Sequence, residues 1–203
     1  MTSRNGESLP GMILLILASA LLAPATALAH NPGGVAGGFA SGFMHPLTGI
    51  DHILAMVAVG IWGAQLGAPA IWALPIAFPL VMSVGGAMGV RGVSLPGVEI
   101  GIAASALLLG LMIYSEARPS LVTAALLVGF FAIFHGYAHG TELPRAANPL
   151  AYGLGFVLAT GLLHVSGITM GLIHRWPLGA RVLRFAGGSI SLAGLFLLVH
   201  HFA

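Results

Sequence analysis

Long apolar stretches are the feature of this sequence that most restricts its fold. At about 1.5 Å per residue, each is long enough to cross a hydrocarbon core about 30 Å thick. Only 6% of the residues are charged, against about a quarter in soluble domains. The sequence therefore predicts an all-α, polytopic transmembrane bundle of six helices. These stretches lie near 47–66, 70–90, 97–115, 119–139, 149–173 and 180–201.

The N-terminus has the pattern of a secretory signal peptide. Arg4 precedes an apolar run at 12–22, Pro24 interrupts that run, and residues 27–29 form the small-x-small sequence that signal peptidase reads. We predict cleavage before His30, which divides the chain into a signal peptide at 1–29 and a membrane domain at 30–203. An uncleaved signal anchor is the alternative. In both cases the segment that follows begins on the exported side.

The distribution of arginine agrees with this orientation, because cytoplasmic loops of membrane proteins carry an excess of Lys and Arg. With the mature N-terminus outside, four arginines lie on the cytoplasmic side and two in exported loops. We therefore expect a multi-pass protein of a bacterial cytoplasmic membrane with a periplasmic mature N-terminus. The cytoplasmic arginines are Arg118, Arg175, Arg181 and Arg184, and the exported ones are Arg91 and Arg145.

Charge and composition exclude several classes of function. The net charge is only +2 and the chain contains no lysine, so nucleic acid is not an expected partner. A Walker motif is excluded as well, because Gly-x4-Gly-Lys requires a lysine. The absence of cysteine excludes disulfides, thiolate metal sites and thiol nucleophiles. The expected environment is the lipid bilayer.

The first cluster of ionisable residues opens the first mature helix. It contains His45, Asp51 and His52, and Pro46 suits the first position of a helix. Ionisable residues inside a membrane are costly and are usually functional. His45 and His52 are seven residues apart, which is about 10 Å along a straight helix. They can share one ion only if the entry to this helix is irregular.

The second cluster closes the fourth span. His135 and His139 are spaced i and i+4, and Glu142 follows three residues later, so all three project from one helix face. By the predicted topology, this end of the fourth span lies at the same membrane face as the start of the first helix. Imidazole and carboxylate ligands suit Ni²⁺, Co²⁺ and Zn²⁺. The two clusters therefore predict a divalent-metal site, with a purely structural hydrogen-bonding role as the alternative.

Other polar residues have weaker assignments. His30, as a new N-terminus, offers an amine and an imidazole for metal capture. His164 lies midway along the fifth span and is a candidate inner relay on the ion path, or a structural histidine. Glu99 is a candidate for attracting cations near the exported start of the third span, or an interfacial residue. The remaining histidines are read as interfacial; they are His174, His200 and His201.

The pattern His-x5-Asp-His, followed by Phe-His-Gly-x-Ala-His-Gly-x-Glu, resembles the HupE/UreJ family of nickel and cobalt permeases. The resemblance covers the whole mature chain. It implies secondary transport of Ni²⁺ or Co²⁺ across the cytoplasmic membrane for hydrogenase or urease maturation, with no enzymatic activity and no cofactor beyond the transported ion. A cytoplasmic metallochaperone is a candidate partner, and the oligomeric state stays open. The metal motifs that the resemblance assigns are His45, Asp51 and His52, and His135, His139 and Glu142.

Two other functions fit the same residue types. An intramembrane zinc hydrolase would hold Zn²⁺ with three histidines and an acid and leave one position open for water. A membrane metal sensor or accessory subunit would bind the ion without moving it. Accumulation of metal without turnover of lipid or peptide distinguishes transport from both.

Overall fold

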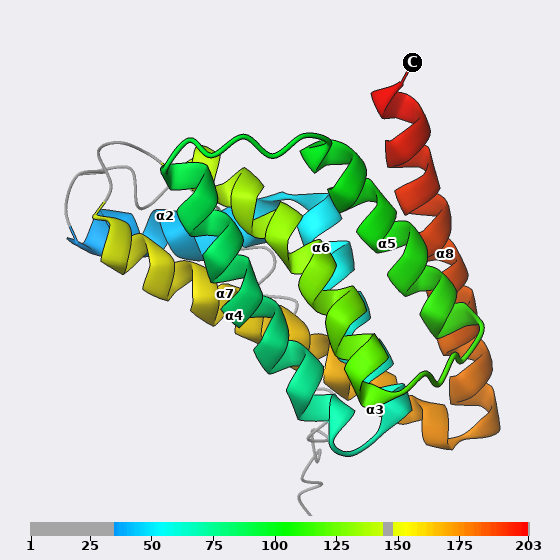
Figure 1. The fold of residues 1–203 in the computed structure, drawn as a ribbon. Helices are drawn as coiled ribbons and strands as arrows, with labels where there is room; N and C mark the ends of the chain where they lie inside the picture. Colours follow the sequence, from blue (N-terminus) through cyan, green and yellow to red (C-terminus); the bar gives the residue numbers. More distant parts are fainter. Residues whose placement is uncertain (1–34, 144–147, 203) are drawn as a thin grey trace, which may run out of the picture. The chain divides into compact units, whose positions relative to one another are not determined.

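The computed structural model describes residues 35–143 and 148–202, and these residues form helices joined by short connections. The predicted all-α class is confirmed. The predicted signal peptide and the boundary at residue 30 lie outside the described residues. The helices are α2 (Val35–Thr48), α3 (Ile50–Leu66), α4 (Ala70–Val90), α5 (Val98–Tyr114), α6 (Leu121–Thr141), α7 (Pro149–Gly171), the 3₁₀ helix η2 (Leu172–Arg175) and α8 (Pro177–His201) (Figure 1).

Several of these helices are suited to cross a membrane. Within the described residues, four are long and apolar enough by length and composition: α4, α6, α8, and α7 together with η2. The bent pair of α2 and α3 passes the same test as a fifth span. Helix α5 is apolar but has only 17 residues. The protein is thus a multi-pass membrane protein, and a sixth crossing stays a prediction.

Helix α2 lies before the predicted first span at 47–66, and that span begins as α3 at Ile50. The expectation that Pro46 takes the first position of this helix is wrong, because Pro46 lies inside α2. Helices α2 and α3 meet at Gly49 with a bend of 80°. Pro46 has no N–H to donate to the carbonyl of Gly42, so the last turn of α2 is weakened. Gly49 has extended backbone angles, and its carbonyl accepts the first hydrogen bond of α3 from the N–H of Ile53 at 3.0 Å. The irregular entry that a shared ion requires is therefore present.

Helix α3 is the centre of the core. It packs against α4, α5 and α7 and also contacts α8. Its side chains at Met56, Ile61 and Trp62 are fully buried. The indole N–H of Trp62 donates to the carbonyl of Ala117 at 3.0 Å, so this buried polar group is satisfied. The start of α3, which carries Asp51 and His52, is held in place by the packing of the rest of the helix.

The outward faces of the helices are apolar. In a soluble protein such a surface would be unfavourable, but in a bilayer it contacts lipid chains while the helical backbone satisfies its own hydrogen bonds. Three histidines of the spans, His52, His135 and His164, are instead buried inside the bundle. Examples of large exposed apolar side chains are Leu80 on α4, Leu126 on α6, Leu154 on α7, and Phe185 and Phe196 on α8.

Glycines allow the closest helix contacts. A Cβ on Gly85 of α4 would meet the carbonyl of Ile133 of α6, and one on Gly136 would meet the carbonyl of Met82. Small residues at i and i+4 permit this kind of approach in membranes. Gly97 has a different role, because its φ of 71° is left-handed and it lies directly before the first residue of α5.

The α4–α6 contact predicts a difference between two glycine substitutions. Gly85→Ala would force a methyl group against backbone, so we expect it to lower the free energy of unfolding by about 1–3 kcal/mol. Gly161→Ala is the matched control, because nothing lies within 4 Å of a Cβ at Gly161. Alanine is also the better helix former, so the control is expected to be neutral or slightly stabilising. Thermal unfolding in detergent measures both, and equal stability of the two variants would contradict the packing.

Candidate metal site

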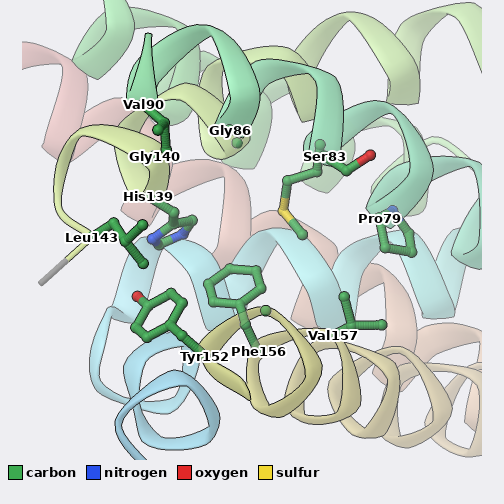
Figure 2. Close-up of a pocket in the computed structure, with 13 residues that line it drawn as sticks. Pro79, Ser83, Gly86, Val90, His139, Gly140, Leu143, Tyr152, Phe156 and Val157 are labelled. Carbon is green, nitrogen blue, oxygen red and sulfur yellow. The ribbon is translucent and has the colours of Figure 1, made fainter. Parts of the chain in front are cut away.

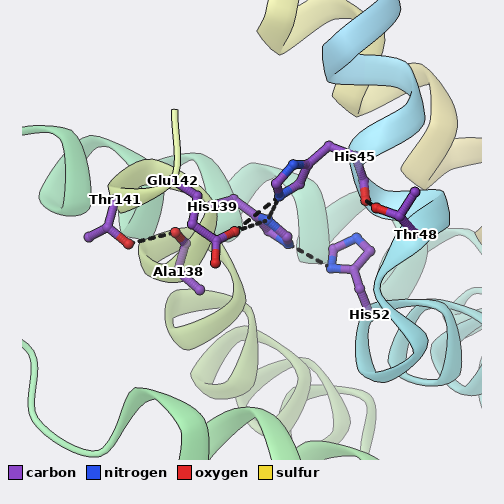
Figure 3. Close-up of polar contacts among 7 residues, drawn as sticks. All are labelled: His45, Thr48, His52, Ala138, His139, Thr141 and Glu142. Atoms are coloured by element: carbon purple, nitrogen blue, oxygen red, sulfur yellow. Dashed lines mark hydrogen bonds and ion pairs between the residues drawn. The ribbon is translucent and has the colours of Figure 1, made fainter. Parts of the chain in front are cut away.

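Three ligand atoms from two distant parts of the chain converge at one end of the bundle. His45 lies near the end of α2, His139 lies in the last turn of α6, and Glu142 directly follows α6. His45 Nε2 is 2.9 Å from His139 Nδ1 and 3.1 Å from Glu142 Oε2 (Figure 3). His139 Nδ1 is 3.8 Å from the same carboxylate oxygen. We call these three residues the central cluster.

The spacing of the central cluster suits a single metal ion. Two donors that bind one ion at about 2.1 Å lie about 3.0–3.4 Å apart in octahedral or tetrahedral geometry. The three observed separations, 2.9, 3.1 and 3.8 Å, lie close to this range. Elsewhere in the described part of the chain, no group of three or more His, Asp or Glu side chains brings its ligand atoms as close together. The arrangement can therefore hold a divalent cation with little movement.

His52 contacts the central cluster through the ring nitrogen of His139 that faces away from His45. Its Nδ1 lies 2.9 Å from Nε2 of His139, whose other ring nitrogen faces His45. If His139 binds an ion through Nδ1, its Nε2 carries the proton and donates to His52 Nδ1. His52 then fixes the tautomer and the ring orientation of His139. His52 Nε2 is buried and has no hydrogen-bond partner among the described residues.

Aromatic rings of α7 hold these imidazoles in place. The ring of Phe156 has its centre 4.7 Å from that of His139, 5.5 Å from that of His52 and 6.2 Å from that of His45. Tyr152 lies one turn earlier and contacts His45. Figure 2 shows His139 beside Tyr152 and Phe156 at an almost entirely apolar pocket of about 170 Å³ between α4, α6 and α7. The cluster is thus bounded by apolar surface on this side.

A polar pocket lies on the other side of the cluster. It has a volume of about 230 Å³ and is lined by His45, His139 and Glu142 together with Asp51 and Glu99. Asp51 therefore does not join the three converging atoms, but its carboxylate faces the same space. Three carboxylates around one pocket create a negative potential that attracts cations. Glu99, for which the sequence leaves open a role in attracting cations or an interfacial position, is one of the residues that line this pocket.

His135 and His164 lie deeper in the bundle. His135 Nε2 is 2.9 Å from the hydroxyl of Ser105, which donates its own proton to the carbonyl of Ile102. His135 therefore donates to Ser105 through Nε2 and keeps a lone pair on Nδ1. His164 is buried, and neither ring nitrogen has a partner among the described residues. The ring of Phe78 contacts both imidazoles, with centres 5.6 and 5.7 Å away.

The structure thus sorts the residues that the sequence singles out. It brings His45, His139 and Glu142 together and places His52 directly behind them. His135 and His164 supply no atom to the central cluster, although His135 lines the polar pocket beside it. His30 lies outside the described residues. Sequence reasoning missed Ser105, Phe78 and Phe156. Ser105 is a polar residue inside an apolar run and could have been noticed, whereas nothing separates the two aromatic residues from ordinary apolar residues of a span.

Comparison with known proteins places the chain in a family. The family described as HupE / UreJ protein matches residues 17–197. Protein HupE of Rhizobium leguminosarum bv. viciae is 46% identical over 181 residues, which cover 89% of this chain and 94% of that protein. No solved structure matches the chain. With the two histidine clusters meeting at one end of a multi-pass helical bundle, this chain belongs to the HupE/UreJ family.

Proposed function

We propose that this protein is a permease that imports Ni²⁺ or Co²⁺ across the bacterial cytoplasmic membrane. The observation that carries the proposal is the convergence of His45 Nε2, His139 Nδ1 and Glu142 Oε2 at the end of a transmembrane bundle. Nitrogen and oxygen donors of this kind suit borderline divalent ions. The expected orientation has the mature N-terminus in the periplasm, so the central cluster faces the side from which metal arrives.

The membrane potential is a sufficient energy source for such a permease. An inside-negative potential is worth about 2.3 kcal/mol per charge per 100 mV, so a divalent cation gains about 4.6 kcal/mol on entry at that potential. This corresponds to roughly a thousandfold accumulation at equilibrium. Binding at the site must stay weak enough for the ion to leave again. A partly exposed cluster with only three converging donor atoms fits this requirement.

The proposed path runs inward from the central cluster through the buried histidines. His52 contacts His139 directly, and the ring centres of His52 and His135 are 5.5 Å apart. His164 lies beyond Phe78 and offers two ring nitrogens without partners among the described residues. An ion that leaves the cluster would meet these imidazoles in turn. In this scheme Asp51 and Glu99 guide the ion to the cluster, and His30 is a candidate for first capture in the periplasm.

The physiological setting follows from the family resemblance. Nickel and cobalt imported in this way would serve hydrogenase or urease maturation, and a cytoplasmic metallochaperone is a candidate acceptor for the ion. The proposal includes no catalytic reaction. The ion is the substrate of the protein, and no further cofactor is required.

Uptake of radiolabelled Ni²⁺ and Co²⁺ tests the proposal. In cells that lack their own high-affinity importers, we expect the wild-type protein to accumulate metal. We expect His139→Ala and Asp51→Ala, at matched membrane levels, to lose at least about 90% of this uptake because each removes a metal ligand or a guiding charge. His174→Ala is the matched control. His174 lies in η2 and lines neither the apolar nor the polar pocket. Among the described residues, its Nδ1–H donates to the carbonyl of Gly171 at 2.9 Å.

Each outcome of the uptake measurement has a definite meaning. Wild-type rates in both site variants would show that the cluster has only a structural role. No uptake by well-expressed wild-type protein would contradict the permease and favour a zinc hydrolase or a sensor. Turnover of lipid or peptide would then identify the hydrolase, and metal binding without flux would identify the sensor.

A second prediction concerns His52. If it orients His139 through their hydrogen bond, then His52→Ala should weaken Ni²⁺ binding by about 10–100-fold, as is usual when a partner of a metal-binding histidine is removed. His52→Asn places an amide oxygen near the position of Nδ1 and should retain much of the affinity. Calorimetric titration of the purified variants measures both. Equal losses in the two variants would instead indicate that His52 binds the ion itself.

A further inference from the structure

A second cavity lies outside the central cluster, between α3, α5 and α8. It has a volume of about 210 Å³. Four of the side chains that line it are of metal-binding types: Asp51 from α3, Glu99 from α5, and His200 and His201 from the end of α8. The two histidines have no assigned role in the proposed function. The cavity therefore joins residues from three helices that are distant in sequence.

Helix register explains why these residues meet. Leu197, His200 and His201 are spaced i, i+3 and i+4, so they lie on one face of α8. Glu99 and Ile102 occupy one face of α5 in the same way. The two helices are packed closely along their length, because a Cβ on Gly194 would meet the backbone N–H of Leu107. This packing holds the end of α8 beside the start of α5, as Figure 1 shows.

The outer cavity adjoins the pocket of the central cluster. Asp51, Glu99 and Ile102 line both spaces. An ion held between His200, His201 and the two carboxylates would therefore contact Asp51 and Glu99, which also line the central pocket. Asp51 is the residue that both spaces share at the start of α3, where the chain turns at Gly49.

The side chains of the outer cavity are available to a ligand. In the described part of the chain, the ion pairs are those of Glu142 with His45 and His139, so neither Asp51 nor Glu99 is paired with a histidine. Both histidines of the outer cavity are exposed. Their ligand atoms and those of the carboxylates are more widely spread than the atoms of the central cluster. Such a set binds a divalent cation more weakly and releases it more readily.

We propose that Asp51, Glu99, His200 and His201 form a second, outer site for a divalent cation of the nickel and cobalt type. The site captures the ion at the exported face and passes it to the central cluster by way of Asp51. Its role as an entry point rests on the proposed transport function, but its ability to bind metal does not. Two imidazoles and two carboxylates form a donor set that suits these ions.

Metal titration of the purified full chain in lipid nanodiscs tests the site. Calorimetry with Ni²⁺ alone should show one fewer bound ion for the double variant H200Q/H201Q than for wild type, with the weaker phase missing. The tighter phase should remain and serve as a check that the variant is folded. The double variant H45Q/H139Q should lose the tighter phase instead. H174Q, a histidine substitution outside both cavities, should bind as wild type does.

Uptake measurements test the role in entry. H200Q/H201Q should raise the Ni²⁺ concentration for half-maximal uptake by about three-fold or more and leave the maximal rate unchanged, since saturating metal fills the central cluster without prior capture. Wild-type stoichiometry together with a wild-type uptake curve would overturn the proposal. If the wild-type protein transports no metal, the binding stoichiometry still decides whether the outer site exists, so failure of the two proposals is distinguishable.

Discussion

The break between α2 and α3 is the constraint on which the metal site depends. In a straight helix His45 and His52 would lie about 10 Å apart. With the chain bent by 80° at Gly49, they contact opposite ring nitrogens of the same residue, His139. The imidazole of His139 thus joins the half-buried His45 near the end of α2 to the buried His52 in the first turn of α3. The sequence Pro46 to Gly49 produces this geometry because Pro46 lacks an N–H and Gly49 is extended.

Close glycine packing holds the other half of the site against this bend. Gly85 and Gly136 bring α4 and α6 into backbone contact, which fixes the helix that carries His139. Gly155 of α7 approaches the carbonyl of Phe39 in α2, so α7 is held beside the same bend. Phe156 follows Gly155, and its ring contacts the imidazoles of His45, His52 and His139. The stiffness of the bundle therefore positions the ligands before any ion arrives.

Sequence reasoning predicts the helical class, most span boundaries and the meeting of the two histidine motifs at one end of the bundle, but it does not predict helix α2, which carries His45. It also shows that His45 and His52 need an irregular helix entry, although it does not place the break at Gly49. It could not separate His139 from His135, which share a helix face but differ in depth and in partners. Spans that are apolar on all sides give no periodic signal for which face is inward. For that reason the contacts of Phe156, Ser105 and His200 could not be predicted from the sequence and are seen only in the structure.

X-ray absorption at the nickel edge of the purified, Ni²⁺-loaded protein tests the central cluster most directly. Our interpretation predicts multiple scattering from two imidazoles and a light-atom shell that includes a carboxylate oxygen. The substitutions H45Q and H139Q are each made in the H200Q/H201Q background, which lacks the outer site. Each of them is expected to remove one of the two imidazole contributions. An unchanged imidazole signal in both variants would contradict the metal site proposed for His45, His139 and Glu142.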